Sequence, residues 1–173
     1  ELLNRYLARM TPVIEKHGGT IDEFIGDAIL VIFGAPLACA DHASRAVACA
    51  LDMQLAMDEF NRESLTRGAP AMEMGIAVNT GEVVVGNIGS ATRMKYGVVG
   101  SAVNMTARIQ SFTLGGQVLV SERTLKELNG MARVDGHLRV KVKGVDEPVC
   151  IYDVGEIRGQ YGLSLPLPKH LAN

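Results

Sequence analysis

The chain has 173 residues, of which 47% are hydrophobic and 21% are charged. This composition is typical of a soluble globular protein and is sufficient for one well-packed domain. The formal net charge is -2, from 17 basic and 19 acidic residues that are mixed along the chain. The chain has no basic stripe that could neutralise a phosphate backbone, so we do not expect it to bind nucleic acid.

The cysteines and the hydropathy of the chain bear on its location. Cys39, Cys49 and Cys150 are widely spaced in apolar surroundings, which predicts buried thiols in a reducing compartment and no zinc site. We find neither an apolar run as long as a membrane span nor a signal peptide. We therefore expect a cytoplasmic domain without direct membrane contact. The sequence starts at Glu1 inside a helical pattern, so we expect it to be part of a longer protein.

The spacing of apolar residues predicts the elements in chain order. Helices are expected over residues 2–17, 41–67, 102–112 and 121–128. Strands are expected over residues 20–25, 28–33, 72–78, 82–86, 96–99, 118–120, 138–143 and 149–154. Asp41 and Ser121 are expected to cap the helices that follow them.

Two hairpins are predicted. Gly26 and Asp27 separate two β-branched runs and have the composition of a two-residue turn. Asn79, Thr80 and Gly81 are expected to form a second turn, between strands 72–78 and 82–86.

Helices and hairpins follow one another without a regular βαβ repeat, which predicts an α+β fold with helices on a largely antiparallel sheet. We expect one domain over residues 1–158, followed by an irregular tail over 159–173.

Glu23 lies in an apolar strand. Strand alternation predicts that it shares a face with Ile21 and Ile25 and lies opposite Leu30 across the turn. The other face is apolar too, so we expect the hairpin to be covered on both sides. A buried carboxylate without a partner costs several kcal/mol, so Glu23 needs one. A Lys or Arg on a neighbouring strand and a ligand are both possible partners.

Asp27, Asn104 and Arg108 each have a structural and a functional interpretation. An Asp at a hairpin tip is commonly a turn former, and an Arg on an amphipathic helix is commonly a solvated charge. However, Asn104 and Arg108 lie four residues apart on one helix face, just after Gly100 ends a strand. Backbone amides and the helix dipole at such a helix start favour phosphate.

Five runs carry a resemblance to a known family: GGTIDEFIGDAILVIFGAP, DHASRAV, GIAVNTGEVVVGNIGS, YGVVGSAVNMTAR and the KVKG that ends at Gly144. In this order they resemble the catalytic domain of class III nucleotidyl cyclases, over about Glu1 to Val154. The resemblance implies a ferredoxin-like α+β fold related to polymerase palms. It also implies a head-to-tail homodimer that converts a nucleoside triphosphate into its 3',5'-cyclic monophosphate and pyrophosphate with two divalent cations, Mg²⁺ or Mn²⁺.

The resemblance assigns roles to particular residues. Asp27 matches the second of two metal-binding aspartates, Asn104 the residue that positions the ribose, and Arg108 the residue that stabilises charge on the reacting phosphorus. Lys143 matches a lysine that binds the terminal phosphates. In the family, the metals are held by one subunit while the base-reading, Asn and Arg groups come from the other.

Glu23 and Gly97 match the two base-reading positions. Adenylate cyclases of the family usually have Lys where Glu23 stands, and guanylate cyclases usually have Glu. A carboxylate accepts both N1–H and the exocyclic amine of guanine, whereas adenine N1 is itself an acceptor. The sequence therefore predicts GTP as substrate. Gly97 offers no side chain to select either base, so an adenylate cyclase with an atypical base pocket stays open.

The family's first metal aspartate lies on a strand that precedes the first helix, and the sequence starts inside that helix. We expect the missing strand, and a regulatory domain, to lie upstream in a longer protein. The remaining alternative is a catalytically silent nucleotide-binding or dimerisation module.

Overall fold

The structure is a computed structural model in which residues 1–168 are described. Within that range the helices are α1 (Leu2–Lys16), α2 (His42–Thr66), α3 (Ser101–Gln110) and α4 (Glu122–Glu127). The strands in the same range are β1 (Thr20–Ile25), β2 (Ala28–Ile32), β3 (Ile76–Val78), β4 (Val84–Ser90), β5 (Arg93–Val99), β6 (Val118–Ser121), β7 (Ala132–Val140), β8 (Val149–Ile157) and β9 (Leu163–Ser164).

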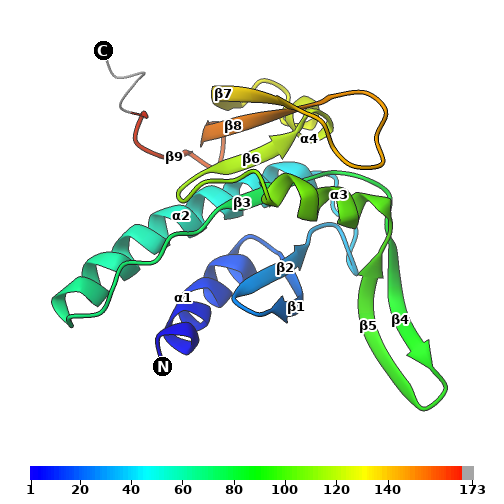
Figure 1. The fold of residues 1–173 in the computed structure, drawn as a ribbon, viewed down its shortest axis with the longest axis horizontal. Coiled ribbons are helices and arrows are strands. Elements are labelled where there is room, and N and C mark those ends of the chain that lie inside the picture. The colour runs from blue at the N-terminus through cyan, green and yellow to red at the C-terminus, as the bar shows by residue number, and fades with distance from the viewer. Residues whose placement is uncertain (169–173) are drawn as a thin grey trace.

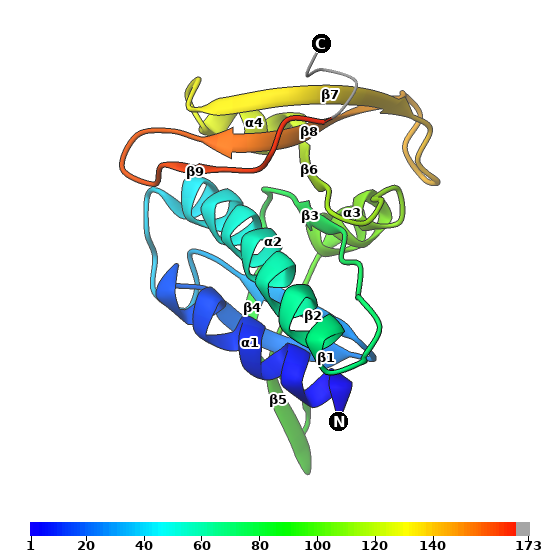
Figure 2. The same cartoon turned by 90° about the vertical axis from the view of Figure 1, so that its left-hand side faces the viewer.

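The long helix α2 lies in the middle of the molecule. One side of it faces a sheet with the order β3-β6-β8-β7, and the other side faces α1 and the β1–β2 hairpin (Figure 2). The β4–β5 hairpin extends away from these layers (Figure 1). The fold is therefore mixed α+β, as the alternation of helices and hairpins predicts.

The main sheet combines one parallel and several antiparallel pairs. β3 runs parallel to β6, while β8 is antiparallel to β6, β7 and the short β9. β6 pairs with β8 up to Asp153, and β9 pairs with it at Glu156 and Ile157. The tail predicted as irregular thus contributes a strand. Residues 169–173 of that predicted tail lie outside the described range.

The second predicted hairpin is wrong. β4 pairs with β5, whereas β3 pairs with β6 far along the chain. The Asn79–Gly81 segment packs on α3 instead, because the Asn79 amide donates to the Ala102 carbonyl at 3.0 Å. A Cβ on Gly81 would lie 2.6 Å from the Ala102 Cβ, so glycine is needed for this close approach.

Two local predictions also need correction. The strand predicted over 138–143 ends at Val140, and Lys143 lies in the turn that follows. Asp41 takes the N-cap position of α2, but its side chain does not cap. It accepts hydrogen bonds from Arg45 and Tyr161 instead, so this carboxylate ties the C-terminal segment to the start of α2.

Burial of α2 on two sides explains its position. Val47 and Leu51 pack in a cluster with the main sheet, where Val118 and Val154 are fully buried. Further along the helix, a second cluster joins α2 to α1 and to the inner face of the β1–β2 hairpin. Its buried members are Tyr6, Met10, Ile14, Cys49, Met53, Met57 and Phe60. The sequence predicted one apolar face for α2, whereas the helix has two.

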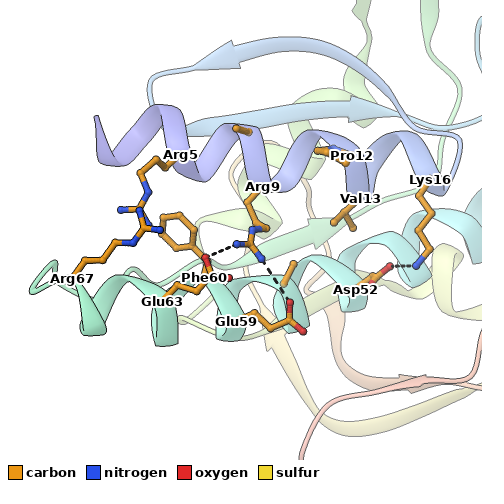
Figure 3. Close-up of a pocket in the computed structure, with 12 residues that line it drawn as sticks. Arg5, Arg9, Pro12, Val13, Lys16, Asp52, Glu59, Phe60, Glu63 and Arg67 are labelled. Carbon is orange, nitrogen blue, oxygen red and sulfur yellow. Dashed lines mark hydrogen bonds and ion pairs between the residues drawn. The ribbon is translucent and has the colours of Figure 1, made fainter.

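Ion pairs fasten α1 to α2 along the edge of this second cluster (Figure 3). Arg9 donates to Glu63 at 2.6 Å, and Lys16 donates to Asp52 at 3.0 Å. His17 Nε2 also lies 2.8 Å from the Asp52 carboxylate. Burial alone would raise the pKa of Asp52, but the hydrogen bonds from His17 and Lys16 outweigh it and lower the pKa. The carboxylate is therefore stabilised in its charged form.

We expect Phe60→Ala to lower the free energy of unfolding by about 3–5 kcal/mol, because the ring is 1% exposed in the α1–α2 cluster and its removal leaves a cavity. Urea denaturation measures this. Leu65→Ala on the same helix is the control, since Leu65 is 60% exposed. A similar loss for both variants would contradict the burial of this side of α2 against α1.

Candidate active site

A β-bulge in β1 sets the geometry of the first half of the site. Ile21 pairs with Val31, and Glu23 pairs with Leu30, so Asp22 is an extra residue in the ladder. Ile21 therefore packs against the α1–α2 cluster, while Glu23 lies on the opposite face with Leu30. The position opposite Leu30 is as predicted. The shared face with Ile21 is wrong, because simple alternation does not allow for the bulge.

Glu23 and Asp22 both approach one cation on β5. The Lys95 ammonium donates to Glu23 Oε2 at 2.7 Å and lies 4.0 Å from Asp22 Oδ2. The hydrogen bond to Glu23 raises the pKa of Lys95. The salt bridge predicted as one possible partner of Glu23 is therefore present. The Glu23 side chain is still 43% exposed, which leaves room for a ligand and corrects the prediction that the hairpin is covered on both sides.

Gly97 lies next to this cluster. It is buried on β5, two residues after Lys95 and on the same strand face. A Cβ built on Gly97 would lie 3.6 Å from Asp22 Oδ1 and 3.8 Å from the Ile88 side chain. The structure thus brings the two predicted base-reading positions, Glu23 and Gly97, to the same place between β1 and β5.

Asp27 lies exposed at the tip of the β1–β2 hairpin. Gly26, with a φ of 62°, takes the left-handed backbone that the two-residue turn requires. Ile25 pairs with Ala28, which confirms the predicted turn. The charge of Asp27 is close enough to Tyr6 to add to the effect of burial in raising the pKa of that phenol.

Asn104 and Arg108 lie on α3, which starts after Gly100. The φ of Gly100 is 148°, and a Cβ there would lie 3.3 Å from the Glu82 carbonyl oxygen, so a side chain is disfavoured. Asn104 is exposed and Arg108 is half-buried. Ile109, on the opposite side of the helix, is fully buried and fixes which face α3 presents to solvent.

The turn that carries Lys143 lies beside Arg108. It occupies a tight turn in which the Val145 amide donates to the Val142 carbonyl at 3.1 Å. Gly144 follows with a φ of 84°, the conformation that the third position of a type II turn needs. A Cβ on Gly144 would lie 3.7 Å from Arg108 Nη1. The turn that carries Lys143 therefore lies against the Arg108 guanidinium.

The predicted site residues form two groups in one chain. Glu23 and Gly97 meet at β1 and β5, and Arg108 meets the Lys143 turn. Within the described residues, the side chains of Asp27, Asn104, Arg108 and Lys143 make no hydrogen bond or ion pair. These side chains are free to bind a ligand. Within the described part of one chain, no hydrogen bond or ion pair connects Asp27 with Arg108 or Lys143.

The acidic groups on their own do not make a metal centre. Among residues 1–168, no group of three or more His, Cys, Asp or Glu side chains is placed to hold a metal ion. Asp27 supplies one carboxylate at the hairpin tip, and a two-cation site needs more oxygen ligands than that. The described residues therefore do not fit a complete two-cation centre.

A groove of about 620 Å³ lies elsewhere, along the outer side of α1 and α2 (Figure 3). Its lining charges largely pair with one another, as Arg9 does with Glu59 and Glu63. The guanidinium of Arg5 lies over the Phe60 ring at 5.4 Å. None of the predicted site residues lines this groove.

Comparison with known proteins resolves the family. Residues 1–154 match the family described as "Adenylate and Guanylate cyclase catalytic domain". The chain belongs to this family.

Solved cyclase structures share the fold. The crystal structure of the guanylyl cyclase Cya2 is 53% identical with a TM-score of 0.91, and the match covers 95% of this chain and 84% of that one. The adenylyl cyclase CyaB from P. aeruginosa is 34% identical with a TM-score of 0.82, over 91% of this chain and 82% of that one. The likeness thus extends to cyclases named for either nucleotide.

A curated relative adds a fact about length. The adenylate cyclase of Anabaena cylindrica is 38% identical over 162 residues, which is 88% of this chain and 31% of that protein. The cyclase domain therefore spans about a third of that relative. No helix among the described residues is long and apolar enough to cross a membrane.

Two residues of the cyclase domain gain importance from the structure. The sequence alone predicts a surface charge at Lys95, near the proposed site, and gives no role to Asp22, which lies in an apolar run. Both leave a signal: Lys95 shares a strand face with Gly97, and Asp22 and Glu23 are adjacent carboxylates in a strand. Two neighbouring polar residues in such a strand indicate a bulge or a site.

We expect Gly144→Ala to raise the KM for the nucleotide, because an Ala at this positive φ strains the turn that carries Lys143 by about 1–2 kcal/mol. Steady-state kinetics of the full-length protein measures the effect. Gly136→Ala is the control, since Gly136 has no positive φ and a Cβ there meets nothing within 4 Å. Equal KM values for both variants would contradict the role of the turn.

Proposed function

We propose that the domain is a guanylate cyclase, which converts GTP into 3',5'-cyclic GMP and pyrophosphate. The observation that carries the proposal is the exposed carboxylate of Glu23 beside Gly97. Guanine presents N1–H and an exocyclic amine on one edge, and a carboxylate accepts from both. Adenine N1 is an acceptor, so the same carboxylate repels it. A site built for one hydrogen-bonding edge can discriminate strongly against the other.

The comparisons support a cyclase without separating the nucleotides. Cya2, with 53% identity, is named a guanylyl cyclase, while the more distant CyaB is named an adenylyl cyclase. The preference for GTP therefore rests on Glu23 and its surroundings.

We also propose that the active form is a homodimer with two shared sites. Class III cyclase domains act as dimers on a nucleotide substrate. The chain offers apolar side chains for such contact on the projecting β4–β5 hairpin (Figure 1) and on the end of β1. Those exposed by more than a third are Phe24, Ile25, Val84, Ile88, Met94, Tyr96 and Val99. An apolar surface of this kind indicates an interaction site.

In the proposed dimer, Asp27 of one copy meets Asn104, Arg108 and the base-reading pair of the other. Each chain then contributes to two equivalent sites. This arrangement accounts for polar side chains that have no partner within one chain. It also requires Glu23 and Asp27 of the same chain to serve different sites, although they lie on one hairpin.

The reaction places clear demands on these residues. The ribose 3'-hydroxyl attacks the α-phosphorus, a P–O bond forms, and the bond to pyrophosphate breaks. Asn104 would orient the ribose, and the Arg108 guanidinium would stabilise charge on the phosphoryl oxygens in the transition state. Lys143, beside Arg108, would hold the terminal phosphates that leave as pyrophosphate. The hydroxyl proton passes to solvent or to a phosphate oxygen.

Class III cyclases generally use divalent metal ions. A requirement for Mg²⁺ or Mn²⁺ is therefore part of the proposal, with Asp27 as the ligand that this chain offers. Because the described residues supply only that carboxylate at the hairpin tip, further ligands have to come from outside them.

An adenylate cyclase is the second candidate. Lys95 favours it, because its ammonium lies 2.7 Å from Glu23 and can donate a hydrogen bond to adenine N1. Gly97 excludes neither base. The two candidates differ in which charge faces the base: the carboxylate of Glu23 for guanine, or the ammonium of Lys95 for adenine.

We expect the full-length protein to convert GTP faster than ATP at equal concentration, with Mn²⁺ present. Glu23→Lys should lower kcat/KM for GTP by about a hundredfold or more, because the donor edge of guanine then faces a cation. Chromatographic measurement of both cyclic products tests this. Glu15→Lys makes the same charge change on an exposed part of α1 and should leave the ratio of GTP to ATP turnover unchanged.

The outcomes separate the candidates. Faster turnover of ATP, retained in Glu23→Lys, would support the adenylate cyclase. Turnover of neither nucleotide would support a silent nucleotide-binding or dimerisation module.

A further inference from the structure

Asp22 carries a polar atom that the proposed reaction leaves unused. Its side chain is 3% exposed, and its Oδ1 is buried without a hydrogen-bond partner. A buried carboxylate in this condition loses its hydration without full compensation. Such a group in a strand that is otherwise apolar needs an explanation.

The bulge gives Asp22 its place. As the extra residue between Ile21 and Glu23, Asp22 faces β5 together with Glu23. Its Oδ2 lies 4.0 Å from the Lys95 ammonium, and its Oδ1 faces Gly97. Lys95 therefore lies within reach of two carboxylates and makes a short hydrogen bond to one of them.

We propose that Asp22 is a positioning residue: when the base binds to Glu23, the Asp22 carboxylate accepts a hydrogen bond from the Lys95 ammonium. The inference rests on the proposed function. In the free domain Lys95 pairs with Glu23 at 2.7 Å. Guanine uses both oxygens of Glu23 for its N1–H and amine, so it competes with Lys95 for Oε2. The carboxylate of Asp22 is the acceptor already in place beside it.

The exchange lowers the cost of binding the base. A charge-assisted hydrogen bond is roughly twice as strong as a neutral one, so displacing Lys95 into solvent would offset much of the gain at Glu23. A move of little more than an ångström to Asp22 keeps the ammonium paired. The Lys95 side chain is 54% exposed, and its flexible stem allows this movement. The ammonium then stays beside the pocket, where guanine O6 can accept from it.

Gly97 keeps Asp22 available for this role. A Cβ on Gly97 would lie 3.6 Å from Asp22 Oδ1, so a hydroxyl side chain there would donate to the carboxylate. The carboxylate would then be partly satisfied and would attract Lys95 less. With glycine, no such donor competes with Lys95 for the carboxylate.

Asp22→Asn tests the inference in the full-length protein. The change keeps the shape of the side chain and removes its charge, so Lys95 competes with GTP for Glu23. We expect the KM for GTP to rise about five- to tenfold with kcat within about twofold. Asp58→Asn, an exposed carboxylate on α2, controls for net charge and should not change the KM.

A double-mutant cycle separates positioning from a structural role. In the Lys95→Met background no ammonium competes with GTP for Glu23. There, Asp22→Asn should leave the KM for GTP unchanged or lower it. An equal rise of the KM in both backgrounds, or no rise in either, would overturn the inference. Absence of GTP turnover in the unaltered protein would overturn both the inference and the proposed function.

Gly97→Ser gives a second variant that leaves Asp22 intact. Its hydroxyl should donate to Asp22 Oδ1, and the KM for GTP should rise in the Lys95 protein more than in the Lys95→Met background. An effect of equal size in the two backgrounds would count against the exchange, even if Asp22→Asn does not fold.

Discussion

Two adjacent carboxylates on β1 share one cation on β5, and this electrostatic constraint holds the base-reading half of the site together. The bulge at Asp22 turns both side chains toward Lys95. Without the cation, Asp22 would be buried with its charge uncompensated, and Glu23 would have no fixed orientation. With it, the β1–β2 hairpin and the β4–β5 hairpin are joined where the base is proposed to bind. The proposed base specificity thus depends on an interaction that also joins the two hairpins.

Helix α2 supplies the rigid support for this arrangement. Its two buried sides fix the β1–β2 hairpin against α1 and the main sheet against the opposite face (Figure 2). α3 and the Lys143 turn are placed separately, through Ile109 and its contacts with Leu119 and Ile151. The predicted base-reading residues and the predicted phosphate-binding residues therefore rest on different packed clusters. In the proposed dimer both groups serve one site, which Asp27 of the other copy completes.

The sequence is sufficient for the features that depend on local chemistry. The turn at Gly26 and Asp27, the glycine before α3 and the pairing of Glu23 with Leu30 follow from composition and spacing. The family membership and the mixed α+β fold are also confirmed.

Features that depend on distant parts of the chain could not be predicted in the same way. The parallel pairing of β3 with β6 joins segments about forty residues apart, and local turn composition at Asn79–Gly81 suggested a hairpin instead. The bulge turns Ile21 toward the core and turns Asp22 toward Lys95. Strict alternation along the strand does not predict this arrangement. The assignments of Asp27, Asn104, Arg108 and Lys143 remain predictions. Among the described residues of one chain, no hydrogen bond or ion pair joins Asp27 to Arg108, which supports the proposal of a shared site.

Mixed dimers test the central claim, that each site combines Asp27 of one copy with Arg108 of the other. Full-length Asp27→Asn and Arg108→Ala chains are each expected to be inactive alone. Co-expressed in equal amounts, they should recover about a quarter of the unaltered cyclase activity, because half of the dimers are mixed and each of these has one intact site. Activity no higher than that of the two separate variants would contradict the account.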